Sequence, residues 1–153
     1  MSVEALDRPL VTVKRANDLV GYRISPTDTN YMIPLFDPVG DGAAVNFTAI
    51  VEVFQVGGRT PPNSHAIAHE MFFVMRGRGI AHAAGRSIPL SAGDAILLDP
   101  GGEHVIENTG TGKLYTLTVM VPNEEFAELI HAGQRVLLDD EDRALLADLP
   151  MTR

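Results

Sequence analysis

The chain contains no cysteine, which excludes disulfide bonds and thiolate metal ligands but leaves the redox compartment open. Positive charge is scarce, because 12 Lys and Arg stand against 20 Asp and Glu and leave a net charge of -8. This balance disfavours nucleic acid or an anionic membrane surface as a partner. No apolar run approaches the roughly 20 residues that span a bilayer. Residues 1–10 lack the apolar stretch of a secretory signal, so we expect a cytoplasmic location.

A chain of 153 residues is long enough for one domain with a sizeable core. We find no internal repeat, low-complexity tract or linker that would divide it. We therefore expect a single domain built from three segments. These are an N-terminal arm with edge strands over residues 1–42, a β-barrel over 43–121, and a C-terminal helical segment over 122–153.

The central segment carries a repeated β-strand signal. Between Val45 and Val121, alternating or β-branched stretches recur about every 8–12 residues, with glycine or proline between them. Strands at this spacing are typical of a sandwich or barrel. Two weaker stretches, 10–15 and 31–36, predict further strands, and Pro34 suits the second of them to an edge or irregular position.

The pattern becomes helical after Pro122. Asn123 is suited to cap a helix that Gly133 would end, and a second short helix is predicted over 140–149. The expected fold class is therefore all-β, a barrel or jelly roll with short C-terminal helices.

Four side chains of metal-ligand type fall among these strands and turns: Asn63, His65, Glu70 and His104. Asn63 and His65 are two residues apart and so point to one face of an extended chain. The short loop 66–69 lets Glu70 open the next strand beside them, and hairpin partners on one face lie about 4.5–5.5 Å apart at Cβ. His104 has to be brought in by the fold. A single histidine on a strand is more often a hydrogen-bonded core or surface residue, but several ligand types at converging spacings indicate a divalent-metal site.

At these residues the sequence resembles the two signature motifs of the cupin superfamily. The first family motif is Gly, five residues, His-x-His, three or four residues, Glu, six residues and Gly. In this chain Gly57 is followed by five residues, then Asn63-Ser-His65, four residues, Glu70, six residues and Gly77. One position differs, because Asn63 stands where the family usually has its first histidine ligand.

The second family motif is Gly, five residues, Pro-x-Gly, two residues, His, three residues and Asn. The chain has Gly93, five residues, Asp99-Pro-Gly101, two residues, His104, three residues and Asn108. Asp99 stands where this motif has its proline, and Pro100 follows it. We expect the side chain of Asn108 to secure the following turn through hydrogen bonds to nearby backbone. The resemblance implies a cupin-type barrel or jelly roll with the ion held inside by both motifs.

The replacement at Asn63 affects the chemistry, since an amide oxygen is a weaker and harder ligand than imidazole. The resemblance implies His65, Glu70 and His104 as metal ligands. Two histidines and one carboxylate form the facial arrangement of non-haem Fe(II) oxygenases, which leaves coordination positions open. Fe(II) is therefore the expected ion, with Zn, Mn or Ni as alternatives. Asn63 either completes the shell weakly or holds a bound water; the contrary interpretation is a cupin that has lost its metal.

Two further residues near the motifs are candidates for a role. His69 adjoins Glu70, so strand alternation should turn it away, to a position behind the ligands or on the surface, with an alternative ligand as the minority interpretation. On the last strand, Tyr115, Leu117 and Val119 share a face that we expect to line the metal cavity. The Tyr115 hydroxyl is then a candidate catalytic group that orients a substrate; the alternative is core packing with the hydroxyl at the rim.

Three functions follow from this interpretation. The first is a non-haem metal-dependent dioxygenase that acts on a small organic molecule. The second is an isomerase, lyase or hydrolase in which the ion is a Lewis acid and Glu70 is freed for proton transfer. The third is a non-catalytic cupin that binds a small molecule. The resemblance also favours a homodimer, which would cover edge strands in any of the three cases.

Overall fold

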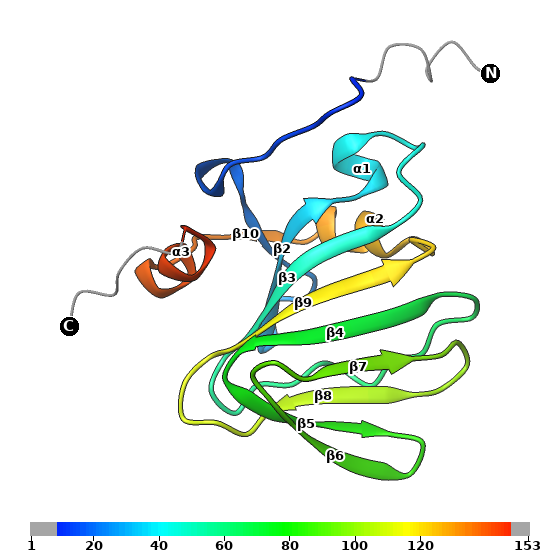
Figure 1. The fold of residues 1–153 in the computed structure, drawn as a ribbon, viewed down its shortest axis with the longest axis vertical. Helices are drawn as coiled ribbons and strands as arrows, with labels where there is room; N and C mark the ends of the chain where they lie inside the picture. The colour runs from blue at the N-terminus through cyan, green and yellow to red at the C-terminus, as the bar shows by residue number, and fades with distance from the viewer. Residues whose placement is uncertain (1–8, 148–153) are drawn as a thin grey trace.

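The computed structural model describes residues 9–147 and consists mainly of two antiparallel β-sheets that face each other (Figure 1). The larger sheet has seven strands in the order β10-β1-β2-β3-β9-β4-β7. Their bounds are β1 Gly21–Arg23, β2 Asn30–Phe36, β3 Thr48–Phe54, β4 His69–Arg76, β7 Ala95–Leu98, β9 Leu114–Val121 and β10 Gln134–Val136. The smaller sheet has the order β6-β5-β8, with β5 Arg78–Ala83, β6 Arg86–Ser91 and β8 His104–Asn108.

The described helical segments are short and leave the sheets to dominate the fold. They are a 3-10 turn at Ala16–Asp18 and the helices α1 Pro38–Asp41, α2 Phe126–His131 and α3 Asp140–Ala147. None of the helices within the described residues is long and apolar enough to cross a membrane. The predicted all-β jelly roll with short C-terminal helices is confirmed. The parts of the predicted arm and helical segment that fall in 1–8 and 148–153 lie outside the described residues.

Two predicted boundaries differ from the structure. The stretch 10–15 is not a strand: it is largely exposed and pairs with none of the described strands, so nothing satisfies its backbone groups in a ladder. Conversely, β10 was not predicted, because only three residues between two helices form it. It exists through its pairing with β1, where Tyr22 lies opposite Arg135.

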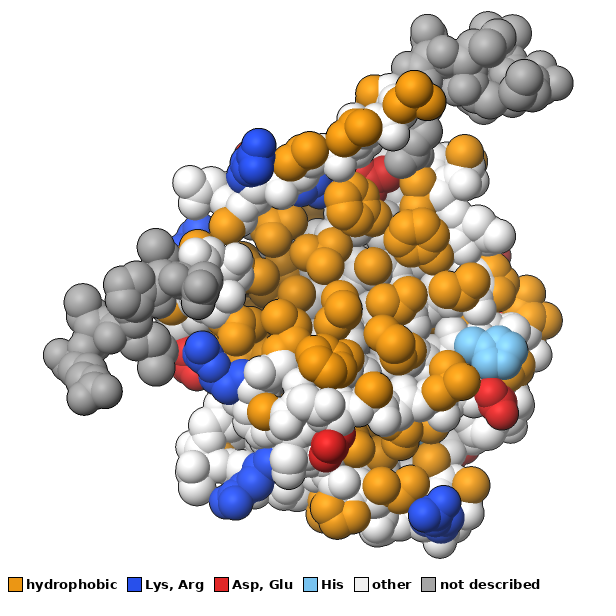
Figure 2. Space-filling model, viewed as in Figure 1, with side chains coloured by type: hydrophobic (Ala, Val, Ile, Leu, Met, Phe, Trp, Pro, Cys, Tyr) orange, Lys and Arg blue, Asp and Glu red, His pale blue; other side chains and the backbone are white. Residues whose placement is uncertain are grey.

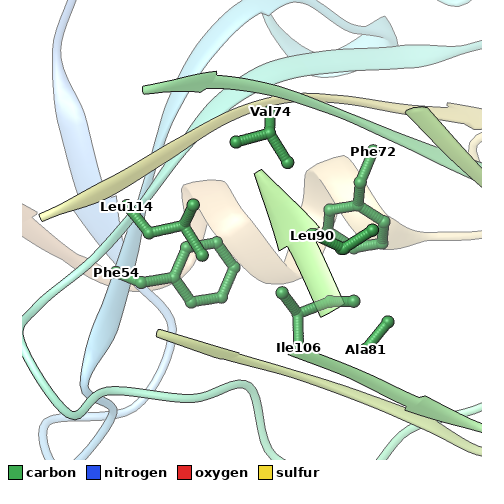
Figure 3. Packing of buried hydrophobic residues seen from close by; sticks show 7 residues of the cluster. All are labelled: Phe54, Phe72, Val74, Ala81, Leu90, Ile106 and Leu114. Carbon is green, nitrogen blue, oxygen red and sulfur yellow. The ribbon is translucent and has the colours of Figure 1, made fainter. Parts of the chain in front are cut away.

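The main apolar core fills the space between the two sheets (Figure 3). Its buried members come from β3, β4 and β9 on one side and β5, β6 and β8 on the other: Phe54, Phe72, Val74, Ala81, Leu90, Ile106 and Leu114. The turns between these strands need residues with positive φ, and the motif glycines Gly77 and Gly93 supply φ values of 92° and 94°. Asn108 donates from Nδ2 to Gly112 O and accepts from Gly110 N–H, which confirms its predicted role in the turn.

The C-terminal helices cover opposite faces of the larger sheet. Helix α2 packs Ile130 against Met32 and Ile50 on the inner face, near the metal-ligand residues. Helix α3 packs Leu145 and Leu146 against an apolar cluster on the outer face. The larger sheet is therefore buried on both sides at this end, and the direction of each side chain cannot be deduced from hydrophobicity alone.

Candidate metal centre

Three of the predicted ligands meet at one point between the sheets. His65 precedes β4, Glu70 is the second residue of β4, and His104 is the first residue of β8. One ligand atom from each lies within 4.8 Å of the others. Glu70 Oε2 is 2.6 Å from His65 Nε2 and 3.1 Å from His104 Nε2. Ligand atoms bound at about 2.0–2.2 Å to one Zn²⁺-sized ion lie roughly 3 Å apart, so a small shift of the His65 and Glu70 side chains would let the cluster hold a divalent cation.

Backbone pairing explains why these residues converge. Asn63 and His104 form an isolated antiparallel bridge, with His104 N–H donating to Asn63 O at 2.9 Å. Gly101 N–H donates to His65 O at 2.7 Å, which ties the first motif to the turn of the second. Glu70 reaches the same point because β4 lies between β9 and β7 in the larger sheet. The two motifs therefore form one site across the gap between the sheets.

The donor set passes a simple test of fit for a metal ion. Asn63 Oδ1 is buried and has no hydrogen-bond partner among the described residues, and Asn63 lines the same cavity as His65 and Glu70. A buried acceptor without a partner is costly unless something else satisfies it. A bound cation, or a water held by one, would satisfy this oxygen. The residues present therefore fit a divalent cation.

The cluster is electrostatically balanced around one buried carboxylate. Burial alone would raise the pKa of Glu70, but hydrogen bonds and charge from His104 and His65 bring it below its ordinary value. The hydrogen bond to Glu70 correspondingly raises the pKa of His65. Glu70 is thus held as an anion, the form in which a carboxylate binds a cation.

Glu124 holds the loop that carries His65, a role that sequence reasoning missed. Its carboxylate accepts from the backbone N–H groups of Ala66, Ile67 and Ala68. Its Oε2 also lies 3.6 Å from His65 Nδ1, on the far side of the ring from Glu70. At this distance the carboxylate acts on the ring through its charge, and it positions the ring by holding the loop that carries His65. From the sequence, Glu124 is only the residue after the predicted cap Asn123.

Replacing Glu124 with alanine should weaken metal binding about 10–100-fold, the usual cost of losing a group that orients a ligand. The physical reason is that three loop N–H groups lose their common acceptor and the His65 ring loses a neighbouring negative charge. Titration with metal, followed by calorimetry, measures the affinity. Glu125→Ala, at the exposed neighbouring residue, is the control and should leave the affinity unchanged; similar losses in both variants would contradict this role.

His69 lies on the other face of β4 from Glu70, as strand alternation predicted. Its side chain is 55% exposed, and its Nε2 lies 3.4 Å from Asp99 Oδ1. It is therefore directed away from the cluster.

The prediction that Tyr115 lines the metal cavity is wrong. Glu70 and Phe72 pair with Met120 and Thr118 on β9, so the inner face of that strand carries the even-numbered residues and Tyr115 faces outward. Its hydroxyl donates to Asp142 Oδ1 of α3 at 2.7 Å. Burial and the neighbouring Asp142 raise its pKa. Tyr115 anchors α3 to the sheet and is removed as a catalytic candidate; the same alternation turns Leu117 and Val119 outward.

Glu52 was missed by the sequence analysis and lies inside the metal cavity. It is 2% exposed on the inner face of β3. It accepts from Asn30 Nδ2 at 2.8 Å and from Thr118 Oγ1 at 3.3 Å. Burial, followed by the charge of Glu70, raises the pKa of Glu52 to about 8. In the metal-free protein the cavity thus favours the protonated form of Glu52 and the ionised form of Glu70.

The elevated pKa of Glu52 should make the metal-free protein less stable at alkaline pH. Between about pH 4.5 and 8 the folded chain holds a proton that the unfolded chain has lost, so stability falls as pH rises, by up to about 1.4 kcal/mol per unit. In urea denaturation, the free energy of unfolding of the wild type should fall relative to that of Glu52→Gln by roughly 3–5 kcal/mol between pH 5 and pH 9. Glu107→Gln, a matched change on the smaller sheet, should show the same pH dependence of stability as the wild type. Equal pH dependence in Glu52→Gln and the wild type would contradict the raised pKa of Glu52.

A cavity of about 330 Å³ opens beside the ligands. Its walls are partly apolar, with Ile24, Met32, Phe126 and Leu129. Its polar lining comprises Asp28, Asn30, Glu52, Thr60, Asn63, Ser64, His65, Glu70 and Glu124, and Pro61 completes it. Among these described residues there is no Lys or Arg. This volume accommodates a small organic molecule in contact with a bound ion.

Comparison with known proteins agrees with this geometry. Residues 50–122 match the family model described as Cupin domain. The Oxalate-binding protein of Thermotoga maritima is 35% identical over 69 residues, which cover 41% of this chain and 57% of that protein. The chain spans just over half the length of the curated relatives that it matches.

Solved structures show the same architecture. A crystal structure described as a predicted oxalate decarboxylase from Thermotoga maritima has a TM-score of 0.64 and 25% identity, and covers 72% of this chain and 99% of its own. A structure of oxalate oxidase has a TM-score of 0.65 and 17% identity, and the match covers 81% of this chain and 65% of that one. At this identity the similarity concerns the fold alone. With both motifs joined in one His/Glu/His cluster, residues 50–122 of this chain form a cupin domain.

Proposed function

We propose that this protein is a metal-dependent dioxygenase that holds Fe(II) through His65, Glu70 and His104 and acts on a small organic molecule. The observation that carries the proposal is the convergence of these three ligands within 4.8 Å beside a cavity of about 330 Å³. Two histidines and one carboxylate leave positions open around the ion for substrate and oxygen. The bound ion would supply redox chemistry at those positions.

The chain itself contributes orientation and the exclusion of water. His65 is oriented from behind by Glu124, and His104 is 2% exposed. Asn63 offers its free amide oxygen to the ion or to a water beside it. The apolar walls of the cavity favour a substrate with an apolar body.

Metal analysis and oxygen uptake together test the proposal. The purified protein, reconstituted anaerobically with Fe(II), should bind one ion per chain and consume oxygen with at least one member of a panel of diketones, catechols and hydroxyacids. Reconstitution with Zn(II) provides the control, because zinc has no redox activity. Absence of bound metal after reconstitution would refute the proposed function. Activity with Zn(II) but not with Fe(II) would contradict an oxygenase and indicate Lewis-acid chemistry instead.

A non-oxidative reaction is the second candidate, and Glu52 favours it. A lyase or isomerase needs a group that gives or takes a proton near neutral pH, and the raised pKa of Glu52, about 8, suits that task.

Ligand binding without turnover is supported by the relative described as oxalate-binding. Calorimetric titration of the metal-loaded protein with oxalate separates this case, which predicts binding with no product.

We also propose a homodimer formed through the outer face of the larger sheet. Hydrophobic side chains gather on this face over β3, β9 and β4 (Figure 2). Several are exposed, among them Phe73 at 38%, Leu97 at 63% and Val121 at 48%. Light scattering should give twice the chain mass of 16.5 kDa, and Leu97→Glu should lower it, because a buried unpaired charge disrupts an apolar interface. A wild-type protein with the mass of a single chain would contradict the proposed homodimer.

The cytoplasmic location stays a prediction.

A further inference from the structure

Glu52 is held in a way that a purely structural carboxylate would not need. It is fully buried and has no Lys, Arg or His among its hydrogen-bond partners in the described residues, which are Asn30 and Thr118. A buried carboxylate without a cationic partner is costly to keep ionised. A leucine or glutamine would fill the same volume at less cost. The placement of an acid here therefore suggests a chemical task.

The surroundings of Glu52 connect it to the metal ligands. On the inner face of the larger sheet, Glu52 pairs with Thr116 of β9, and Thr118 of the same strand pairs with Phe72, two residues from Glu70. The charged and titratable groups that share its cavity are Asp28, His65, Glu70 and Glu124. Helix α2 adds only the apolar Phe126 and Leu129 to the lining. Glu52 and Glu70 therefore face one space from neighbouring parts of one sheet.

The lining determines what an anionic ligand oxygen would meet in this space. No Lys or Arg is among the described lining residues, and Asp28, Glu70 and Glu124 repel negative charge. Apart from the metal ion, the strongest proton donor available to such an oxygen is a protonated carboxyl group. Asn30, which donates to Glu52 through Nδ2, also has a buried acceptor, Oδ1, without a partner among the described residues. It can take a hydrogen bond from a hydroxyl of the same ligand.

We propose that Glu52 is a second catalytic residue of the metal centre, which donates its proton to an oxygen of a small metal-bound ligand. The ligand class is a compact molecule with two neighbouring oxygen donors, such as a 2-oxo or 2-hydroxy acid. In the step, the O–H bond of Glu52 breaks and a new O–H bond forms on the ligand oxyanion. The electron pair stays on Glu52 as a carboxylate, which solvent reprotonates. This inference rests on the proposed metal site but not on the use of oxygen.

Pyruvate is a suitable probe, because its carboxylate and carbonyl oxygens can bind one ion together. Calorimetry on the anaerobic Fe(II)-loaded protein should give an affinity that falls about tenfold for each pH unit above the pKa of Glu52. Binding in that range should take up one proton, measured in two buffers of different ionisation enthalpy. The proton count needs no variant, so it holds even if a substitution at Glu52 impairs folding.

Glu52→Gln keeps the size and a hydrogen-bond donor but cannot titrate. It should bind the same amount of metal as the wild type, while its pyruvate affinity becomes independent of pH over this range. Glu107→Gln, which removes a carboxylate that contacts His82 outside the cavity, should behave like the wild type. Unchanged pH dependence in Glu52→Gln, no proton uptake, or no pyruvate binding to a metal-loaded wild type would each overturn the inference. Absence of metal from the wild type would instead overturn the proposed function, and this inference with it.

Discussion

Replacing His104 with alanine should leave the protein without measurable metal after reconstitution. His104 is 2% exposed, and its Nε2 lies 3.1 Å from Glu70 Oε2. His82, the other histidine of the smaller sheet, contacts Glu107 instead. The loss should exceed the roughly 10–100-fold cost of removing a group that merely orients a ligand. Metal content by elemental analysis, with affinity by calorimetry, measures the effect.

Asn63→Ala is the matched comparison for this prediction. Asn63 occupies the position of a family histidine but offers only an amide oxygen, a weaker ligand. Its removal should lower metal affinity by no more than about tenfold, and circular dichroism should show both variants folded. Equal losses from His104→Ala and Asn63→Ala would mean that the ranking of the ligands is wrong.

Replacing Asp142 with alanine should destabilise the fold by about 3–5 kcal/mol, the range found when one partner of a buried ion pair is removed. Asp142 is 1% exposed. It accepts from Tyr31 at 2.6 Å, from Tyr115 at 2.7 Å and from Lys113 Nζ at 3.1 Å. Its loss leaves two buried hydroxyls and an ammonium group with fewer partners, and releases α3 from the sheet. Urea denaturation measures the free energy of unfolding.

Two further variants separate this anchor from catalysis. Asp140→Ala, at an exposed position in the first turn of α3, should cost less than about 1 kcal/mol. Tyr115→Phe removes one hydrogen bond and should cost about 1 kcal/mol while leaving metal content and oxygen uptake unchanged. Comparable destabilisation by Asp140→Ala and Asp142→Ala, or loss of activity in Tyr115→Phe, would contradict the structural role assigned to this network.

The sequence singled out three residues that the structure brings into one cluster. His65 and Glu70 are separated by four residues, so turn chemistry and strand alternation fix their approximate directions. His104 lies 34 residues after Glu70, and only the family motifs pointed to it before the fold brought it in. Asn108 was predictable from local turn chemistry, since its partners include Gly110 and Gly112. Glu124 could have been found only from its contacts with Ala66, Ile67 and Ala68, more than fifty residues earlier in the chain.

The inward-facing side of β9 could not be predicted from the sequence. Alternation identifies two faces of a strand but not which one points inward. On β9 the sequence favours the apolar face, with Tyr115 and Leu117, as the cavity lining, whereas in the structure the inner face carries Thr116 and Thr118. The outer face near Tyr115 is apolar because α3 covers it. The same ambiguity on β3 concealed Glu52.

By itself, the sequence determined the class of fold, the strand and turn pattern, and the three residues able to bind a cation. Each of these depends on spacings along the chain, through the two-residue period of strands and the backbone limits of glycine and proline. Only the tertiary structure decided which face of each strand looks inward. It thereby assigned Glu52 to the site and Tyr115 to an anchor for α3, and the contacts of Glu124 with the loop 66–68 added that residue to the site. Those assignments depend on which elements cover each face of the sheet, and that is settled by packing between residues far apart in the chain.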